Sequence, residues 1–294
     1  MRILIIGANG LLARNLVNKL SESNEIFALI NHETEPKFIL KRSVTAIHQD
    51  LSDINLTSLP GDIDVLYYLA QSNRFREFPE GVSDMMEVNI NTPIKIIEWA
   101  RTTSVKKFIY ASSGGVYTNP NDPVNEVSEI NANEVLGFYL NSKLCAEMLL
   151  NTFAKYFDTF SVIRPFFIYG KEQNETMLIP RLINSIQNEK QITIFGEEGL
   201  KINPIYVDDA VEASVNILSF KGSKTFNIAG DEVMSLKAIC ILISKLLDKQ
   251  PNLKYENRVQ NDLIADISSM KAHLHYPAIR LEEGLNKLIS HKEG

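Results

Sequence analysis

Short apolar runs rich in β-branched and aromatic residues alternate with segments of helical periodicity through the first 165 residues. This alternation is typical of βαβ units built around a parallel sheet. The predicted strands are Arg2 to Ile6, Glu25 to Ile30, Val44 to His48, Asp64 to Leu69, Lys107 to Ser112 and Thr159 to Arg164. The pattern therefore predicts an α/β fold with a doubly wound parallel sheet.

Two long segments, Met85 to Arg101 and Phe138 to Phe157, carry apolar residues at three- and four-residue spacings, and we predict one helix over each. Beyond Gly170 the regular alternation ends. The elements predicted there are shorter helices, a strand at Gln191 to Phe195, a late strand at Thr225 to Ala229 and a closing helix near Leu281 to Ser290. We expect late segments such as Thr225 to Ala229 to return to the first sheet.

The composition is that of an ordinary globular protein, with 45% hydrophobic and 22% charged residues among 294. A total of 30 Lys and Arg against 36 Asp and Glu gives a net charge of −6, which provides no basic field for nucleic acid or anionic lipid. We therefore expect no nucleic-acid partner and no membrane partner. A small-molecule substrate is the better expectation.

The two cysteines, Cys145 and Cys240, are too few for a disulfide framework and fit a reducing compartment. The apolar runs, with Val65 to Ala70 among the longest, are far short of the roughly 20 residues that cross a bilayer. The N-terminus has no secretory hydrophobic region, so these features together predict a cytoplasmic protein. His273 and His275 stand two apart without a third ligand, and we expect no metal site.

A glycine turn joins the first predicted strand to a helix. Residues 7–13 read Gly-Ala-Asn-Gly-Leu-Leu-Ala, with Ala13 in place of a third glycine. At such a turn a pyrophosphate reaches backbone N–H groups and a helix N-terminus. A tight turn without a ligand is the simpler alternative, but the strand-turn-helix context favours a dinucleotide. We predict a Rossmann-like domain that binds NAD or NADP over residues 1–170, and a smaller, mainly substrate-binding lobe over residues 171–294.

The residue after the second strand leaves the choice between NAD and NADP open. NAD selection normally uses an acidic residue there, which accepts hydrogen bonds from the ribose hydroxyls. That place holds Asn31, followed by His32. Glu33 and Glu35 stand farther along the loop and Lys37 is near, so the loop offers both acidic and basic candidates.

Tyr139 and Lys143 stand four residues apart on one face of the second long helix. A cationic neighbour favours the phenolate, so we predict that Lys143 lowers the pKa of Tyr139 and makes it a general acid or base. The spacing is common by chance, and an exposed pair without function is the alternative. Its place after Ser112 and Ser113 favours function, because these hydroxyls end a strand where ligands bind to α/β sheets.

Several motifs occur in order along nearly the whole chain. They are the glycine turn, Asp-Leu-Ser-Asp at 50–53, Leu-Ala-Gln at 69–71, Val-Asn at 88–89, the run at 105–117 that ends Ala-Ser-Ser-Gly-Gly-Val-Tyr, the Tyr139 and Lys143 pair, Arg-Pro-Phe-Phe-Ile-Tyr-Gly at 164–170 and Tyr-Val-Asp-Asp at 206–209. With them the chain resembles the extended short-chain dehydrogenase/reductase family, the NAD-dependent epimerase/dehydratase group. The resemblance implies hydride transfer at a carbinol or ketone carbon, and a homodimer built through the two long helices.

By this resemblance Ser113 would hold the substrate oxygen, Tyr139 would exchange a proton, and Lys143 would hold the ribose and tune Tyr139. Asn89 would support its helix and a water relay. The residues that would contact the cofactor, besides Tyr139 and Lys143, are Gly7, Asn9, Gly10, Leu11, Leu12, Asn31, His32, Asp50, Leu51, Leu69, Ala70, Gln71, Pro165, Phe166 and Ile168.

Two positions depart from the sugar-nucleotide members of that family. Phe167 stands where asparagine is common, and Ile202 stands where an arginine commonly grips the diphosphate. A bidentate arginine-phosphate contact is hard to replace with an aliphatic side chain, so either another cation binds the diphosphate or the substrate has none. The residues that would meet the substrate are Arg74, Ser113, Gly114, Phe167, Arg181, Lys201 and Ile202, with Arg76 as a further cation.

The leading interpretation is an NAD(P)-dependent sugar-nucleotide epimerase or ketosugar reductase. The second is a reductase of a carbonyl compound that is not a nucleotide sugar. The third is a non-catalytic NAD(P)-responsive binding protein, which the presence of Ser113, Tyr139 and Lys143 disfavours. Gly114 and Gly115 stand where dehydratases of the family carry an acidic pair, so we predict no elimination of water.

Overall fold

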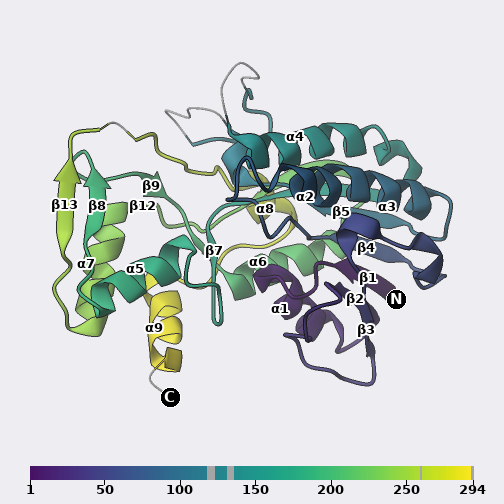
Figure 1. The fold of residues 1–294 in the computed structure, drawn as a ribbon, viewed down its shortest axis with the longest axis horizontal. Helices are drawn as coiled ribbons and strands as arrows, with labels where there is room; N and C mark the ends of the chain where they lie inside the picture. The colour runs from purple at the N-terminus through teal and green to yellow at the C-terminus, as the bar shows by residue number, and fades with distance from the viewer. Residues whose placement is uncertain (118–122, 131–135, 259, 293–294) are drawn as a thin grey trace.

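The structure, a computed structural model, describes residues 1–117, 123–130, 136–258 and 260–292 (Figure 1). Within these residues, seven parallel strands form one sheet in the order β11-β6-β5-β4-β1-β2-β3. The strands are β1 (Arg2–Ile6), β2 (Glu25–Ile30), β3 (Val44–His48), β4 (Val65–Tyr68), β5 (Lys107–Ala111), β6 (Thr159–Pro165) and β11 (Gly222–Ile228). The six strands predicted before residue 165 are confirmed, with ends shifted by at most one residue.

Helices cover both faces of this sheet (Figure 1). On one face lie α1 (Leu11–Leu20) and α6 (Val207–Asn216), and on the other lie α2 (Val82–Met86), α3 (Thr92–Arg101) and α4 (Phe138–Asn151). The predicted Rossmann-like doubly wound fold is therefore confirmed.

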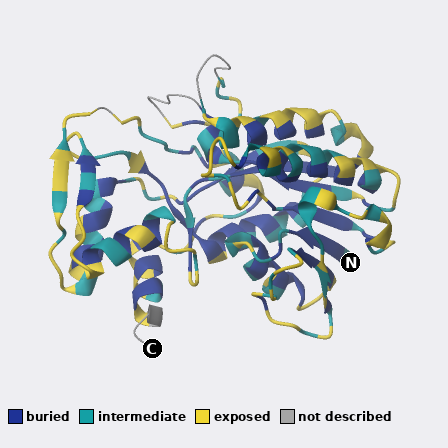
Figure 2. Cartoon of the chain, viewed as in Figure 1, coloured by how far each residue is buried: buried dark blue, intermediate teal, exposed yellow. Residues whose placement is uncertain are grey.

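Alternation along β1 sends side chains into two separate cores. Ile3 and Ile5 pack with α1 and α6, whereas Leu4 and Ile6 pack with α3 and α4. All four are fully buried, so the strand is apolar at every position, as expected for a parallel sheet covered on both faces. The buried strands run through the centre of the larger part of the molecule (Figure 2).

Both long predicted helices differ from expectation: the first is interrupted by a π-helical turn, and the second is shorter. A π-helical turn, Glu87–Asn91, separates α2 from α3. Pro93 has no N–H to donate to the carbonyl of Asn89 four residues earlier, which favours the wider turn. The second helix, α4, ends at Asn151. The hydroxyl of the next residue, Thr152, donates to the Leu149 carbonyl at 2.7 Å and so competes with continuation of the helix.

Most residues after β6 build a second lobe, seen apart from the sheet in Figure 1. In it β8 pairs with β13 in parallel, β9 pairs with β12 antiparallel, and the short strands β7 and β10 pair where the two parts join. The predicted closing helix is found as α9, and the strand predicted near 191–195 as β8. The late strand predicted at 225–229 is β11, which pairs with β6 in the main sheet.

The remaining elements are β7 (Ile168–Tyr169), α5 (Leu178–Gln187), β8 (Ile192–Phe195), β9 (Lys201–Ile202), β10 (Ile205–Tyr206), β12 (Met234–Ser235), α7 (Leu236–Leu247), β13 (Leu253–Glu256), α8 (Ser268–His273) and α9 (Leu281–Lys292). Short 3-10 turns lie at Leu51–Asp53, Leu56–Ser58, Gly114–Val116, Ala154–Tyr156 and Ile217–Ser219.

The strand order reverses at β1, whose neighbours in the sheet are β2 and β4. The chain first proceeds outward to β2 and β3 and then returns to β4 on the other side. At such a switch point the connecting loops diverge and leave a crevice at the carboxyl ends of the strands, where ligands bind. None of the helices in the described part of the chain combines the length and the hydropathy that crossing a bilayer requires.

Candidate active site

A cavity of about 650 Å³ lies at this crevice. Every strand of the main sheet from β1 to β6 contributes residues to it from the turn that follows its carboxyl end. The predicted cofactor residues that line it are Gly7, Asn9, Gly10, Leu11, Leu12, Asn31, Asp50, Leu51, Leu69, Ala70, Gln71, Lys143, Pro165 and Ile168. The structure thus brings together residues spread over most of the first 170 positions.

The glycine turn brings backbone close to this cavity from one side. Gly7 has a positive φ of 82°, and a Cβ there would lie 2.7 Å from the Cα of Ala70 at the end of β4. Gly10 precedes α1 without any capping side chain, so the first N–H groups of the helix have no side-chain acceptor. A helix N-terminus of this kind stabilises a phosphate, and the turn therefore fits a dinucleotide diphosphate.

Asn9 holds the loop after β2 against the glycine turn. Its amide nitrogen donates to the Thr34 hydroxyl at 3.0 Å and to the Glu35 carbonyl at 2.9 Å. Its amide oxygen accepts from the Lys37 backbone N–H at 2.8 Å. Since both ends of the amide are engaged, Asn9 shapes the wall of the cavity through this loop.

Asp50 follows β3 and caps the 3-10 turn that comes next. Its carboxylate accepts from the backbone N–H and the hydroxyl of Ser52, each at 2.8 Å, and these bonds lower the pKa of Asp50. Asp50 therefore stays ionised and is held in place at this end of the cavity.

Tyr139, in the first turn of α4, faces the end of β4. Its hydroxyl donates to the side-chain oxygen of Gln71 at 2.6 Å, and its ring packs against Phe75 with centroids 5.2 Å apart. Burial raises the pKa of Tyr139 to about 12. The prediction that Lys143 lowers this pKa is therefore wrong for this structure, because loss of hydration outweighs any effect of the lysine.

Lys143 lies one turn further along α4 and is almost completely buried. Its ammonium donates to the Ala70 carbonyl at 3.3 Å and lies 4.9 Å from the centroid of the Tyr110 ring. Burial lowers the pKa of Lys143 to about 7, and the negative charge of Glu147 partly opposes this shift. The amine is therefore a hydrogen-bond donor at the cavity wall whose charge is easily changed near neutral pH.

Ser112 and Ser113 play different parts at the end of β5. Ser112 lines the cavity, but its hydroxyl is buried and has no hydrogen-bond partner among the described residues. Ser113 does not line the cavity; it is half-buried, and its hydroxyl accepts from the Gly115 N–H at 3.1 Å. That bond leaves the Ser113 O–H as a donor that a substrate oxygen could accept.

Asn89 is fully buried in the π-helical turn and does not line the cavity. Its amide oxygen accepts from the Ser72 N–H at 2.8 Å, and its amide nitrogen donates to the Ser142 hydroxyl at 2.9 Å. Asn89 thus ties the loop after β4 to α4, next to Lys143. It is a positioning residue in this structure.

The other predicted contacts lie outside the cavity lining and stay predictions. The Ile202 side chain is fully buried, and its strand pairs with that of Met234. Phe167 is partly buried with an unusual positive φ of 45°, in the residue before β7. Three more of these predicted contacts are exposed, namely His32, Arg181 and Lys201. Phe166 is buried against Gly114.

Ten lining residues were not predicted as contacts: Ala13, Ile30, Thr34, Lys37, Ser72, Asn73, Asp84, Val88, Ala111 and Ser112. Ser72 and Asn73 directly follow the predicted Leu-Ala-Gln motif, so the rule that sites form at carboxyl ends of strands could have found them. Asp84 accepts a short hydrogen bond from the Ser72 hydroxyl. It comes from α2, and no local pattern places it at the cavity. Thr34 and Lys37 enter through the loop that Asn9 holds.

Arg74 is the predicted substrate cation that does line the cavity. It is exposed, and its guanidinium donates to the Glu77 carboxylate at 2.7 Å. Arg76 instead reaches across to the loop before α5, where it donates to the Thr176 carbonyl at 3.4 Å. Arg74 is therefore the better placed of the two for a diphosphate.

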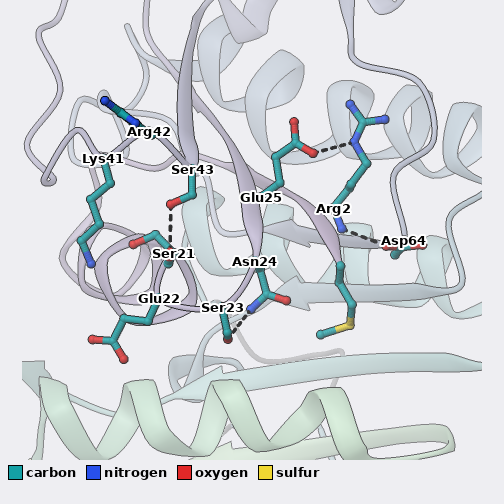
Figure 3. A pocket seen from close by; sticks show the side chains of 11 residues that line it. Arg2, Ser21, Glu22, Ser23, Asn24, Glu25, Lys41, Arg42, Ser43 and Asp64 are labelled. Atoms are coloured by element: carbon teal, nitrogen blue, oxygen red, sulfur yellow. Dashed lines mark hydrogen bonds and ion pairs between the residues drawn. The ribbon is translucent and has the colours of Figure 1, made fainter.

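A second hollow lies at the opposite edge of the sheet, near the start of β1 and β2 (Figure 3). Its polar groups are largely satisfied by one another. The Arg2 side chain pairs with Glu25 at 3.1 Å, and the Arg2 backbone N–H donates to Asp64 at 2.8 Å. The Ser43 hydroxyl donates to the Ser21 carbonyl at 2.8 Å. This hollow lies away from the carboxyl ends of the strands and shows no catalytic arrangement.

Comparison with known proteins agrees with this geometry. The model of the NAD dependent epimerase/dehydratase family matches residues 3–229. An uncharacterised UDP-glucose epimerase of Bacillus subtilis (strain 168) is 27% identical, over 99% of this chain and 98% of that protein. The UDP-glucuronate 4-epimerase of Thermodesulfobacterium geofontis is 28% identical, over 78% of this chain and 72% of that protein. The crystal structure of UDP-glucuronic acid 4-epimerase from Bacillus cereus in complex with NAD has a TM-score of 0.86 and 25% identity, covering 99% of this chain and 96% of that one. The chain belongs to the NAD-dependent epimerase/dehydratase family.

Proposed function

We propose that this protein is an NAD(P)-dependent enzyme that transfers hydride at a carbinol or ketone carbon of a nucleotide sugar, as an epimerase or a ketosugar reductase. The observation that carries the proposal is that Lys143 lines the cavity at the switch point of the sheet, while Tyr139, from the same helix, lies outside the lining and donates to Gln71 in the cavity wall. A nicotinamide dinucleotide supplies the acceptor or donor of hydride when it is bound.

The residues of the chain supply the proton chemistry. Tyr139 donates its phenolic proton to a ketone oxygen during reduction, or accepts the proton of a carbinol during oxidation. Its high pKa favours the protonated form, which Gln71 orients in this structure. Ser113 donates a hydrogen bond to the same substrate oxygen. Lys143 donates to the ribose from the floor of the cavity and stabilises the phenolate when it forms.

A nucleotide sugar is supported by the relatives, because proteins similar along nearly the whole chain are described as UDP-sugar epimerases. Arg74 is the cation at the cavity that would meet the diphosphate. The second candidate is a reductase of a carbonyl compound without a nucleotide, which the buried, aliphatic Ile202 favours. A panel of both compound classes separates them by thermal shift, because a ligand that binds the folded state raises its melting temperature.

Elimination of water is not part of the proposed reaction. Gly114 and Gly115 provide no carboxyl group beside Ser113. A Cβ at Gly114 would lie 2.5 Å from the Phe166 ring, so the packing of this turn excludes an acidic side chain there. Without an acid and a base at these places, a hydroxyl of the sugar has no proton donor to help it leave.

For the whole chain we propose a cytoplasmic enzyme with two parts, a dinucleotide-binding domain over residues 1–170 and a mainly substrate-binding lobe over residues 171–294. It is supported by the free thiols of Cys145, which is exposed, and Cys240, which is buried, since exposed free thiols persist in reducing compartments. The division near residue 170 is supported by the end of β6, after which most elements belong to the second lobe.

Replacement of Tyr139 by Phe tests the assignment of the proton donor. The ring volume is kept, so we expect dinucleotide binding to be retained while turnover falls by about 100-fold or more. Tyr156→Phe is the matched control, because Tyr156 is an exposed tyrosine close to the end of the same helix. Steady-state rates of both variants are the measurement. Near-normal turnover of Tyr139→Phe would remove Tyr139 from the mechanism.

A further inference from the structure

We propose that Tyr110 is a positioning residue for Lys143, because the face of its buried ring holds the lysine ammonium through a cation–π contact and so keeps it charged for the reaction. This inference rests on the proposed function, since it takes Lys143 as the group that meets the ribose and stabilises the phenolate. Tyr110 does not line the cavity, so it acts on the reaction through Lys143.

Tyr110 lies in β5 opposite Tyr68 of β4, and its side chain points to the face of the sheet that α4 covers. It is completely buried, in the same core as Ala146 and Leu150 of α4. Lys143 is 1% exposed, and its Nζ lies 4.9 Å from the centroid of the Tyr110 ring. This distance is within the roughly 6 Å over which an aromatic face attracts a cation.

The ammonium of Lys143 has three N–H groups and few acceptors for them. Among the described residues, the Ala70 carbonyl at 3.3 Å is the one acceptor that it reaches. A buried ammonium with unmet donors is costly, and burial accordingly lowers the pKa of Lys143 to about 7. The ring face of Tyr110 is a second partner, which leaves the side of the ammonium that meets the cavity for a ribose oxygen.

The other ionisable groups around Lys143 do not replace this contact. Glu147, one turn later on α4, raises the pKa of Lys143, but its carboxylate is paired with Arg164 of β6. Tyr139 and Tyr68 are phenols whose pKa is raised by burial, so both are neutral at neutral pH. The aromatic face is therefore the contact that stabilises the ammonium without the formation of a further ion pair.

The hydroxyl of Tyr110 plays no part in this contact. It is buried and has no hydrogen-bond partner among the described residues. Tyrosine and phenylalanine present the same kind of π face to a cation, whereas an aliphatic side chain presents none. Tyr110→Phe therefore keeps the proposed contact and removes an unpaired polar group, and Tyr110→Leu removes the contact while the site stays apolar.

NMR titration of the unliganded full chain, with lysines isotopically labelled at Cε, measures the effect directly. The resonance of Lys143 is the one that is missing from the spectrum of Lys143→Met. We expect the pKa of Lys143 to fall by about 1 in Tyr110→Leu and to be unchanged in Tyr110→Phe, because only the leucine removes the ring. Tyr156→Leu is the matched control, since Tyr156 is an exposed tyrosine near the end of the same helix and should leave this pKa unchanged.

Fluorinated phenylalanines in place of Tyr110 test the same contact without a change of shape, and they serve if the leucine variant does not fold. One, two or three ring fluorines withdraw electron density from the ring face stepwise while the packing is kept. The pKa of Lys143 should therefore fall stepwise along this series. A role in packing alone would leave the pKa the same in every member.

The pH dependence of turnover connects the contact to the proposed function. Since the reaction needs a charged Lys143, the alkaline limb of the pH profile should move to lower pH in Tyr110→Leu and return in Tyr110→Phe. An unchanged pKa of Lys143 along the fluorinated series, an equal fall in Tyr110→Phe, or a pH profile that does not follow the pKa would overturn the inference and leave the proposed function intact. A stepwise fall of the pKa in a protein that turns over none of the nucleotide sugars would confirm the contact and overturn the proposed function.

Discussion

Burial controls the protonation of the two side chains at the centre of the proposed site. It raises the pKa of Tyr139 to about 12 and lowers the pKa of Lys143 to about 7, so burial shifts both groups toward their neutral forms in the folded chain. A neutral phenol is a proton donor for a ketone oxygen. A lysine that titrates near neutrality can gain charge when a phenolate or phosphate comes near. The same burial also makes the free energy of unfolding depend on pH.

The pKa of Lys143 predicts a stability change with pH. Between about pH 7 and about pH 10 the unfolded lysine holds a proton that the folded lysine does not, so stability rises with pH across this window. Relative to Lys143→Met, the free energy of unfolding of the wild type should increase by about 1 kcal/mol per pH unit between pH 8 and pH 10. Urea unfolding at both pH values measures it.

The control for this change is Lys155→Met, since Lys155 is an exposed lysine close to the end of the same helix. A difference between the wild type and Lys143→Met that stays constant with pH would mean that Lys143 remains charged in the folded protein.

At the residue scale, the sequence located Tyr139, Lys143 and the glycine turn but not the electrostatics of the site. Spacing along a helix places two residues on one face, and this needed no tertiary information. Desolvation depends on what covers the residues, and Gln71 reaches Tyr139 from a different strand end. For that reason the predicted direction of the Tyr139 pKa shift was wrong, although Tyr139 and Lys143 do lie on one helix, as the spacing predicts.

At the scale of elements, α4 is anchored to the sheet by a buried polar network behind the proposed site. Glu147, one turn after Lys143, forms a bidentate ion pair with Arg164 of β6. Arg164 also donates to the Tyr117 hydroxyl at 2.7 Å, which in turn donates to Asn227 of β11 at 2.8 Å. One helix and two strands are thereby held in register beneath Lys143.

Breaking this ion pair should be costly. Glu147→Gln leaves the Arg164 charge buried without its partner, and we expect a loss of about 3 kcal/mol in the free energy of unfolding. Glu283→Gln, in the exposed pair with Lys287 on α9, should cost about 0.5 kcal/mol or less. Chemical denaturation of both variants is the measurement. Equal, small effects would show that the buried pair does not hold α4 in place.

The element boundaries show where sequence patterns stop being informative. Apolar periodicity continued through the π-helical turn at Glu87–Asn91, because a wider turn leaves the same residues facing the core. The strands were located almost to the residue, since turn residues and charges bound their apolar runs on both sides. The helix break could be recognised only from Pro93 and from the buried hydrogen bonds of Asn89.

At the scale of the whole molecule, the fold separates a cofactor part from a lobe joined to it by several chain crossings. The sequence predicted a doubly wound parallel sheet but not the order of its strands. The pairing of β11 with β6 depends on contacts between residues about 60 positions apart. The lobe was harder to predict than the sheet because its strands are mostly short and pair far along the chain. Its distant residues, such as Ile202, were therefore placed at the cavity by resemblance alone.

Exposed apolar side chains on the helical face predict a homodimer. Met148 and Leu149 on α4 are 65% and 42% exposed, and α3 runs beside α4 on the same face of the sheet (Figures 1 and 2). A two-fold pairing of these helices would bury both residues in each copy. We expect a dimeric mass at micromolar concentration by light scattering.

Leu149→Glu should shift this dimer toward monomer, because it would bury a charge in the interface. Ile241→Glu is the control, since Ile241 is 52% exposed on α7 in the other lobe. A monomeric mass for the unaltered protein would contradict the predicted dimer.

Hydride transfer at a sugar carbon is the central claim, and isotope tracing of the products tests it most directly. The protein is incubated with reduced dinucleotide that carries deuterium at the transferable position and with a panel of nucleotide sugars and their 4-keto derivatives. Mass and NMR spectra of the products are then recorded. We predict either an epimer that keeps the carbon-bound hydrogen of its substrate, or an alcohol with one deuterium on the new carbinol carbon. An unchanged panel, or a 4-keto-6-deoxy product formed by loss of water, would contradict the account.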